Sequence, residues 1–342
     1  MERMIDRRTI LAAPALLAGQ EKKFRVAVIG TEHGHVRGFM NAAAKRPDVE
    51  AVGPIPFEDR ARVKGEGVEA IACFTSTDRH LEVARLAAAL KLPMMMEKPL
   101  ATTNEDARAI AKLAADVGIP IFVNYETTWY RSHGEIWRFF KEEKAGGKIR
   151  KMVAMDGHQG PKEIGVGADF LDWLTDPQRN GAGALFDFGC YGANLMTWMM
   201  DNQRPLRVVA SVKRNKPEIY ARVDDEATIL VEYEGAQGII EGSWNWPFSR
   251  KDFEVYGEKA YANAFGGNLV RRRKAGAAAE EAIVPMELAK DEADSISYLK
   301  AVARRRMKAG GLSGIENNLI ATEILVAARE SVRTGRMISL RG

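Results

Sequence analysis

The sequence contains few cysteines and few histidines, and this excludes several kinds of structural framework. Its two cysteines, Cys73 and Cys190, are too few for a disulfide-rich fold. Cys73 lies in an apolar run, which is typical of a buried free thiol. The five histidines are scattered, and no His, Cys or carboxylate cluster has the spacing of metal ligands. We therefore predict no bound metal.

Long apolar runs and a strong charge of one sign are also missing. No apolar stretch reaches the roughly 18 residues of a membrane-spanning helix, so we predict no membrane span. The net charge is only +4, and the basic runs at 271–274 and 304–306 lack interleaved aromatic residues. They indicate solvated faces rather than a nucleic-acid surface. A 342-residue chain exceeds the size of a single core, so two domains are expected.

Residues 1–20 have the pattern of a targeting segment. Arg7 and Arg8 precede a short apolar run, and the chain turns polar again at Gln20. This pattern resembles a twin-arginine export signal, which predicts an exported or periplasmic protein that crosses the membrane folded. The alternative is a frayed, mildly apolar N-terminus on a cytoplasmic protein.

Residues 22–126 alternate between strand and helix patterns, which predicts a doubly wound parallel sheet of the Rossmann type. The first strand, F-R-V-A-V-I-G at 24–30, ends on a glycine and leads into a helix, as the phosphate turn of a dinucleotide fold does. The segment 54–67 is too short for a full helix and strand, so the second unit should be trimmed. The expected elements are strands at 49–53, 68–75, 94–96 and 119–124, and helices at 80–90 and 104–117.

The turn after the first strand departs from the dinucleotide fingerprint. That motif needs glycines at its first, third and sixth positions, which here hold Gly30, Glu32 and His35. A carboxylate at the third position would face the phosphate oxygens unfavourably, although Gly34 could restore a close approach in a shifted register. Glu50 has the sequence separation of the ribose-binding acid but lies at the start of its strand.

Two further features suggest chemistry. Lys98 follows the strand at 94–96, at the carboxyl edge where parallel sheets bind ligands, and Pro99 would fix the backbone behind it. The alternative is a surface lysine before a proline turn. Asp187 and Tyr191 are four residues apart, so a helix would present a carboxylate and a phenol on one face. An ordinary buried helix remains the alternative, because the surrounding residues are apolar.

Residues 127–342 predict an α+β domain with a mostly antiparallel open sheet. Strand-like runs follow one another with turns and without long helices between them, and an amphipathic helix at 315–334 ends at Gly335. An exposed sheet face would make a homo-oligomer plausible. The expected strands are 151–156, 208–214, 227–233, 238–244 and 252–256, with a helix near 132–144.

Residues 24–340 resemble the glucose–fructose oxidoreductase, inositol dehydrogenase and MocA family. The motifs are E-K-P at 97–99, G-A-G-A-L-F-D-F-G-C-Y at 181–191, S-W-N-W at 243–246 and F-E-V-Y-G at 253–257. The resemblance implies a domain for NAD or NADP and an open sheet for substrate binding and dimerisation. The family's lysine and aspartate map to Lys98 and Asp187. The position of the family's usual histidine is occupied here by Tyr191, and some members of the family also have a tyrosine there. The position of the family's next aspartate is occupied by Asn194. Ser76 replaces a proline of the family, whereas His80 is retained.

We assign the site residues on this combined basis. Lys98, Asp187 and Tyr191 are the candidate catalytic residues, with Lys98 expected to lower the pKa of the Tyr191 phenol. The candidate cofactor-binding residues are Gly30, Thr31, Glu32, His33, Gly34, His35, Thr75, Ser76, His80, Glu97 and Lys98. The candidate substrate-binding residues are His158, Asn194, Trp244 and Trp246.

The resulting hypothesis is a nicotinamide-dependent oxidoreductase that acts on a carbinol carbon of a sugar or polyol. An exported member would retain its NAD or NADP and regenerate it, by coupling two substrates or by redox-neutral lyase or glycosidase chemistry. The alternative is a non-catalytic carbohydrate-binding or interaction protein that has lost the nucleotide site. Glu32 and the trimmed second unit favour this alternative, whereas the trio of candidate catalytic residues favours an enzyme.

Overall fold

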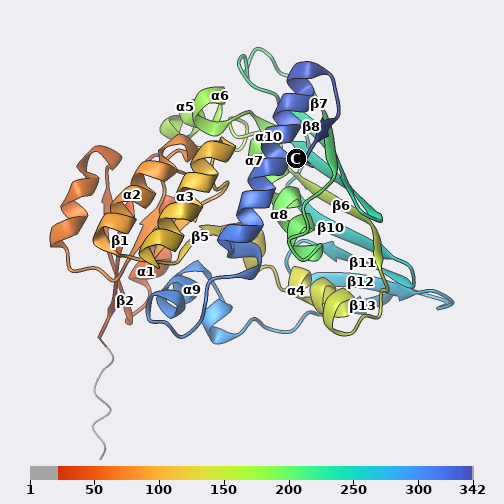
Figure 1. The fold of residues 1–342 in the computed structure, drawn as a ribbon, viewed down its shortest axis with the longest axis horizontal. Coiled ribbons are helices and arrows are strands. Elements are labelled where there is room, and N and C mark those ends of the chain that lie inside the picture. The colour runs from red at the N-terminus through yellow and green to blue at the C-terminus, as the bar shows by residue number, and fades with distance from the viewer. Residues whose placement is uncertain (1–21, 341–342) are drawn as a thin grey trace, which may run out of the picture.

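Two sheets with their covering helices lie side by side in the computed structural model, which describes residues 22–340 (Figure 1). The predicted export signal at 1–20 lies outside the described residues. Helix α10 (Ile315–Thr334) runs between the two halves, because it contacts α3 (Asn104–Val117) on one side and α8 (Gly189–Met199) on the other. No helix within 22–340 is both long and apolar enough to cross a membrane.

The first sheet has five parallel strands in the order β2-β1-β3-β4-β5. Its inner strands read as continuous apolar runs because both faces of the sheet are covered by helices. The elements of this half are β1 (Phe24–Ile29), α1 (Val36–Ala44), β2 (Val49–Ile55), the 3-10 helix η1 (Phe57–Gly65), β3 (Ala70–Cys73), the 3-10 turn η2 (Thr77–Arg79), α2 (His80–Leu90), β4 (Met94–Glu97), α3 and β5 (Ile121–Asn124). Strand β2 forms the sheet edge, and only η1 separates it from β3.

The second sheet has nine strands in the order β13-β12-β11-β10-β6-β9-β8-β7-β14. Every described pairing is antiparallel except that of β6 with β9, so the predicted fold class is confirmed. Its strands are β6 (Ile149–Gly157), β7 (Arg207–Lys213), β8 (Glu226–Tyr233), β9 (Ala236–Ser243), β10 (Arg250–Gly257), β11 (Ala260–Phe265), β12 (Leu269–Lys274), β13 (Glu281–Ile283) and β14 (Ile338–Ser339). The sequence did not predict the last four of these strands.

Shorter helices connect the two sheets, and some of them pack on the second one. The short helices are the 3-10 turns η3 (Glu126–Trp129), η5 (Lys290–Glu292) and η6 (Gly311–Ser313), the π-helical turn η4 (Arg138–Glu142), α4 (Arg131–Trp137), α5 (Ala168–Leu174), α6 (Pro177–Asn180), α7 (Ala184–Asp187) and α9 (Ser295–Ala303).

The single helix expected to carry Asp187 and Tyr191 is interrupted. Helix α7 ends at Asp187 and α8 begins at Gly189, and the Tyr191 backbone N–H bonds to the carbonyl of Phe188 rather than to that of Asp187. The Asp187 carbonyl instead accepts hydrogen bonds from Lys98 Nζ at 3.0 Å and from the Cys190 thiol at 3.2 Å. The helix therefore breaks where its backbone turns to bind Lys98.

Helix α9 belongs by sequence to the second half but packs on the first sheet. Its residues Ile296, Leu299 and Val302 share a buried cluster with β1 and β3, on the sheet face that α1 also covers. Ion pairs hold it there, including Lys300 to Asp48 at 2.9 Å. The predicted domain boundary between residues 126 and 127 therefore assigns α9 to the second domain, although α9 packs on the sheet of the first domain.

Candidate active site

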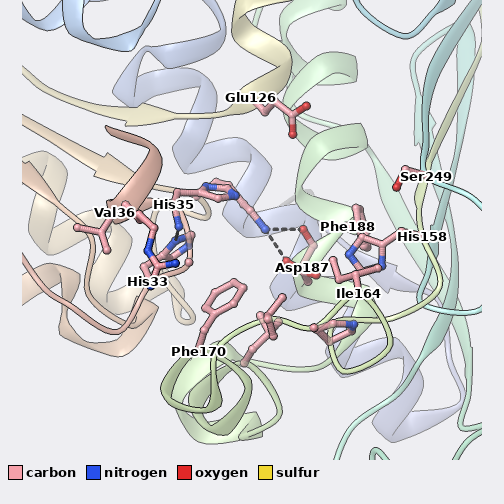
Figure 2. Close-up of a pocket in the computed structure, with 18 of the residues that line it drawn as sticks. His33, His35, Val36, Glu126, His158, Ile164, Phe170, Asp187, Phe188 and Ser249 are labelled. Carbon is pink, nitrogen blue, oxygen red and sulfur yellow. Dashed lines mark hydrogen bonds and ion pairs between the residues drawn. The ribbon is translucent and has the colours of Figure 1, made fainter. Parts of the chain in front are cut away.

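A cavity of about 990 Å³ lies between the turn after β1 and the inner side of the second domain (Figure 2). The turn supplies His33 and His35 on one side of the cavity, and Asp187, Phe188 and His158 face them from the other. The cavity wall includes Thr31, Glu32, His33, Gly34, His35, Lys98, Glu126, His158, Phe170, Asp187, Phe188, Tyr191 and Lys251. The cavity therefore brings the predicted phosphate turn and the predicted catalytic residues together.

A buried ion pair joins Lys98 and Asp187 on the cavity wall. Lys98 Nζ lies 2.5 Å from Asp187 Oδ1, and both side chains are less than one-tenth exposed. The other carboxylate oxygen, Oδ2, accepts a hydrogen bond from the Trp244 indole at 2.9 Å. Every oxygen of this carboxylate therefore has a donor, as a charge in a low-dielectric site requires.

The two charges stabilise one another. Burial alone would lower the pKa of Lys98, but the Asp187 carboxylate outweighs it and raises that pKa above its ordinary value. Burial would raise the pKa of Asp187, but the Lys98 ammonium holds it below its ordinary value. At neutral pH the pair is thus an ammonium facing a carboxylate, and Lys98 is a proton donor.

The expectation that Lys98 lowers the pKa of Tyr191 is wrong. Burial raises that pKa well above its ordinary value, so the phenol stays neutral at physiological pH. Lys98 Nζ lies 5.1 Å from the centroid of the Tyr191 ring, and Lys251 Nζ lies 4.4 Å from it. The Tyr191 ring thus makes cation–π contacts with both ammonium groups.

Lys251 and Glu126 are two site residues that the sequence did not reveal. They form an ion pair with each other, and both line the cavity beside Tyr191. Lys251 lies on β10, directly across from Asp156 of β6, and this long-range register determines where its side chain points. No local motif marks such a residue.

Two features at the carboxyl ends of β1 and β3 bear on nucleotide binding. Gly30 has a φ of +100°, and a side-chain Cβ there would lie 2.4 Å from the backbone of Phe74, so a glycine is required at this close approach. The hydroxyls of Ser76 and Thr77 are buried, and neither has a hydrogen-bond partner among residues 22–340. The Glu32 carboxylate opposes nucleotide binding, because its negative charge lies at the turn where the phosphates would bind.

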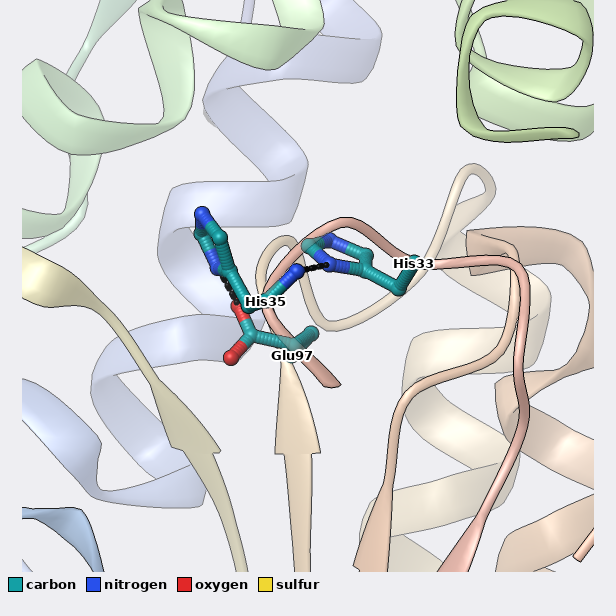
Figure 3. Close-up of side chains that lie close together, drawn as sticks. All are labelled: His33, His35 and Glu97. Carbon is teal, nitrogen blue, oxygen red and sulfur yellow. Dashed lines mark hydrogen bonds and ion pairs between the residues drawn. The ribbon is translucent and has the colours of Figure 1, made fainter. Parts of the chain in front are cut away.

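His33, His35 and Glu97 lie close together at the base of this turn (Figure 3). One ligand-type atom from each lies within 4.8 Å of the others, so the structure contains a His/carboxylate cluster that the scattered histidine positions did not indicate. Glu97 and His33 each already accept a hydrogen bond within the cluster. Glu97 Oε2 accepts from His35 Nδ1 at 3.1 Å, and His33 Nδ1 accepts the His35 backbone N–H at 3.1 Å. The absence of a metal stays a prediction.

Glu97 provides a test by pH. Burial would raise its pKa, but His35 beside it prevails and lowers that pKa to about 2. The carboxylate therefore stabilises the fold above the ordinary Glu pKa, and this contribution is lost as the pH falls from about 4.5 towards 2. We expect Glu97→Gln to lower the free energy of unfolding by the order of 3 kcal/mol at neutral pH. Urea unfolding between pH 7 and 3 should show a smaller acid dependence in the variant; an unchanged dependence would contradict this account.

The remaining predicted residues fall into two groups. His158 lies on the cavity wall, where burial lowers its pKa and its ring meets Phe188 edge-on at 4.9 Å. Trp244 is buried behind Asp187 rather than facing the cavity, and Trp246 packs beside Gly157. The substrate role predicted for Trp244 does not fit its buried position, whereas that of Trp246, which packs beside the wall residue Gly157, stays a prediction.

Asn194 is misplaced for a substrate residue. It is fully buried between α8 and the start of α10, where its amide donates to the Leu312 carbonyl at 2.7 Å and to Asn318 Oδ1 at 3.2 Å. This side chain therefore links helices outside the cavity, because α8 turns it away from the site. Thr75 and His80 are likewise buried below the turn, with His80 Nδ1 bonded to the Leu100 carbonyl.

Comparison with known families matches both halves of the chain. Residues 26–125 match the model described as an oxidoreductase family with an NAD-binding Rossmann fold, and residues 141–263 match the GFO/IDH/MocA C-terminal domain. The chain belongs to the GFO/IDH/MocA oxidoreductase family. The predicted family and the predicted nicotinamide-cofactor domain are thereby confirmed.

Two relatives with similar sequences are a sugar dehydrogenase and a sugar reductase. The chain is 23% identical over 225 residues to D-apiose dehydrogenase of Rhizobium rhizogenes, a match that covers 64% of this chain and 55% of that protein. The chain thus spans little more than half the length of that relative. It is 21% identical over 260 residues to 1,5-anhydro-D-fructose reductase of Ensifer adhaerens, with 75% of each protein covered.

Solved structures of GFO/IDH/MocA-like proteins share the fold. An inositol dehydrogenase homolog from Azotobacter vinelandii, complexed with NAD+, has a TM-score of 0.77 at 18% identity, covering 93% of this chain and 98% of the other. The aldose-aldose oxidoreductase of Caulobacter crescentus, complexed with glycerol, has a TM-score of 0.76 at 19% identity, covering 93% and 100%. At this identity the likeness establishes the fold alone.

Proposed function

We propose that this family member transfers hydride between a bound NAD or NADP and a carbinol carbon of a sugar or polyol. The observation that carries the proposal is the buried Lys98–Asp187 pair, which lies between the nucleotide turn and the second sheet. The relatives named above act on apiose and anhydrofructose, which supports a sugar as the substrate class. The nicotinamide supplies or accepts the hydride when bound.

Lys98 is the residue that moves the proton. Its ammonium has three N–H donors, and the side-chain and backbone oxygens of Asp187 occupy two of them. The third remains for a substrate oxygen. In the reducing direction this N–H stabilises the negative charge that develops on a carbonyl oxygen and then donates its proton, which leaves a neutral amine. In the oxidising direction Lys98 first loses a proton to solvent, and the neutral amine then takes the proton of the substrate hydroxyl.

The other residues position the pair and the substrate. Asp187 keeps Lys98 protonated, and Trp244 fixes the carboxylate from behind. His158 has a lowered pKa, so it is a neutral imidazole at physiological pH. Its Nδ1 accepts the Gly160 backbone N–H at 2.9 Å, which leaves its other nitrogen to donate to a sugar hydroxyl.

We also propose export and a retained cofactor. The Arg7-Arg8 pattern supports export, and a nicotinamide pool does not exist outside the cytoplasm, so an exported enzyme would need to keep and regenerate its cofactor. Two-substrate exchange or redox-neutral lyase or glycosidase chemistry would satisfy this requirement. Assembly through the outer face of the second sheet is a further proposal, supported by the half-buried Val153, Met155 and Ile239 on that face.

The test is to identify what the protein carries and what it oxidises. Mass spectrometry of small molecules released by heat should find NAD or NADP near one per chain if the cofactor is retained. A panel of sugars and polyols should then change the absorbance of that nucleotide. A protein that releases no nucleotide and takes up none in a millimolar titration would contradict the proposed function.

A further inference from the structure

The carboxylate of Glu32 is held as an anion would be. Glu32 Oε2 accepts the Thr31 backbone N–H at 3.1 Å, and Oε1 accepts the Ser76 backbone N–H at 3.3 Å. The Arg79 guanidinium also lies 3.3 Å from Oε1. The Glu32 side chain is only 12% exposed, so its contacts with Ser76 and Arg79 are partly buried, whereas the contact with Thr31 is exposed.

These donors come from two segments that meet at the carboxyl edge of the first sheet. Thr31 follows β1, and Ser76 and Arg79 follow the neighbouring strand β3. Backbone N–H groups at such an edge, together with a guanidinium, are the groups that bind phosphate oxygens in dinucleotide folds. Glu32 also stands at the third position of the turn, where the pyrophosphate approaches the backbone most closely.

The loop after β3 also holds two buried polar groups whose hydrogen bonds are not satisfied by the described residues. The hydroxyls of Ser76 and Thr77 are buried and have no hydrogen-bond partner in the part of the chain that the structure describes. Both side chains are at least 98% buried. Buried hydroxyls of this kind are costly unless something binds them, and phosphate oxygens accept hydrogen bonds from hydroxyls.

The Glu32 position is also fixed from the second domain. The Trp173 indole of α5 donates to the Glu32 backbone carbonyl at 3.3 Å, and Phe170 of the same helix packs on the His33 ring at 4.8 Å. Helix α5 therefore covers the turn while Glu32 occupies its donors. A nucleotide would need to displace the carboxylate within this covered turn.

We propose that Glu32 is an internal substitute for the cofactor's pyrophosphate, occupying an anion site made by Thr31, Ser76 and Arg79. This inference rests on the proposed function and adds that the chain competes with its own cofactor. Binding of a dinucleotide requires the carboxylate to leave these three donors and to avoid the phosphate charge. Glu32 is therefore the residue that determines how tightly the nucleotide is held.

The experiment compares two carboxylates that contact the same arginine. Glu58 Oε1 also lies 3.3 Å from Arg79, but its side chain is 70% exposed, and Thr31 and Ser76 direct their backbone N–H groups to Glu32. We would titrate full-length protein, stripped of any retained nucleotide, with NAD+ by calorimetry. Glu32→Gln should bind about tenfold more tightly than wild type, because the charge is lost while the side-chain size is kept. Glu58→Gln should stay within about twofold, because exposed ion pairs are weak.

Glu32→Gly, which restores the fingerprint glycine, is the second variant, and inorganic pyrophosphate is the second probe. Equal or weaker NAD+ binding by both Glu32 variants would overturn the inference and leave the proposed function intact. If only the Glu32 variants bind pyrophosphate and no form binds NAD+, the inference stands and the proposed function fails. If no form binds either probe, both fail.

Discussion

Replacing Lys98 with methionine should reduce turnover by about a thousandfold, because the substrate oxygen loses its proton donor. The same change leaves Asp187 ionised and buried without its cation, so the free energy of unfolding should fall by about 3 kcal/mol. Steady-state rates and urea unfolding on the same preparation would measure both effects. A Lys98→Met variant with wild-type turnover would remove Lys98 from the mechanism.

A double variant separates catalysis from stability. Lys98→Met combined with Asp187→Asn removes both charges from the buried site, so much of the lost stability should return. Turnover should remain as low as in the single variant, because no proton donor is restored. Recovery of activity together with stability would mean that Lys98 acts only through the fold.

Replacing Gly30 with alanine should destabilise the protein by about 3 kcal/mol or more. The backbone there has a φ of +100°, and the added Cβ would lie 2.4 Å from the carbonyl carbon and oxygen of Phe74. Neither strand β1 nor β3 can move away easily, because both are central in the first sheet. The midpoint of urea unfolding measures the loss.

Gly38 is the matched control for Gly30, since it lies in the first turn of helix α1 on the side that faces solvent. A Cβ at Gly38 would meet nothing within 4 Å, so Gly38→Ala should stabilise the protein by about 0.5–1 kcal/mol. The two substitutions are chemically the same and should shift the unfolding midpoint in opposite directions. Equal shifts would show that the turn tolerates a side chain.

Local patterns predicted most of the first sheet. The strands around 24–30 and 94–96 are short apolar runs bounded by glycine or proline, and helix α3 was expected with its observed ends, Asn104 and Val117. Such elements follow from side-chain periodicity and termination signals within a few residues. Their contacts add little that the local sequence does not already indicate.

Elements that depend on distant partners were missed. Strand β12 reads as a solvated basic run, because its arginines interrupt any alternation of apolar and polar residues. Arg272, within that run, is only partly exposed because it pairs with Glu135 and Glu281. A pairing across more than a hundred residues leaves no signature in the strand itself.

In the candidate site, too, local motifs were predicted correctly and effects of distant neighbours were not. The two motifs that contain Lys98 and Asp187 indicated residues that the structure brings into contact. The expected lowering of the Tyr191 pKa was wrong, because burial raises that pKa. The sequence predicted that Glu32 would repel phosphate. It did not predict the three donors that bind the Glu32 carboxylate, because they come from two separate loops. Charge type can be read from a sequence, and the neighbours that stabilise it cannot.

The position of α9 has a consequence for synthesis on the ribosome. One face of the first sheet, with Phe24, Val26 and Val28, is covered in part by a helix that lies more than 260 residues later in the chain. At about 5–20 residues per second, this surface waits at least ten seconds for its cover. During that interval the nascent chain presents an apolar sheet face to its surroundings, so the earliest domain to emerge is among the last to be completed.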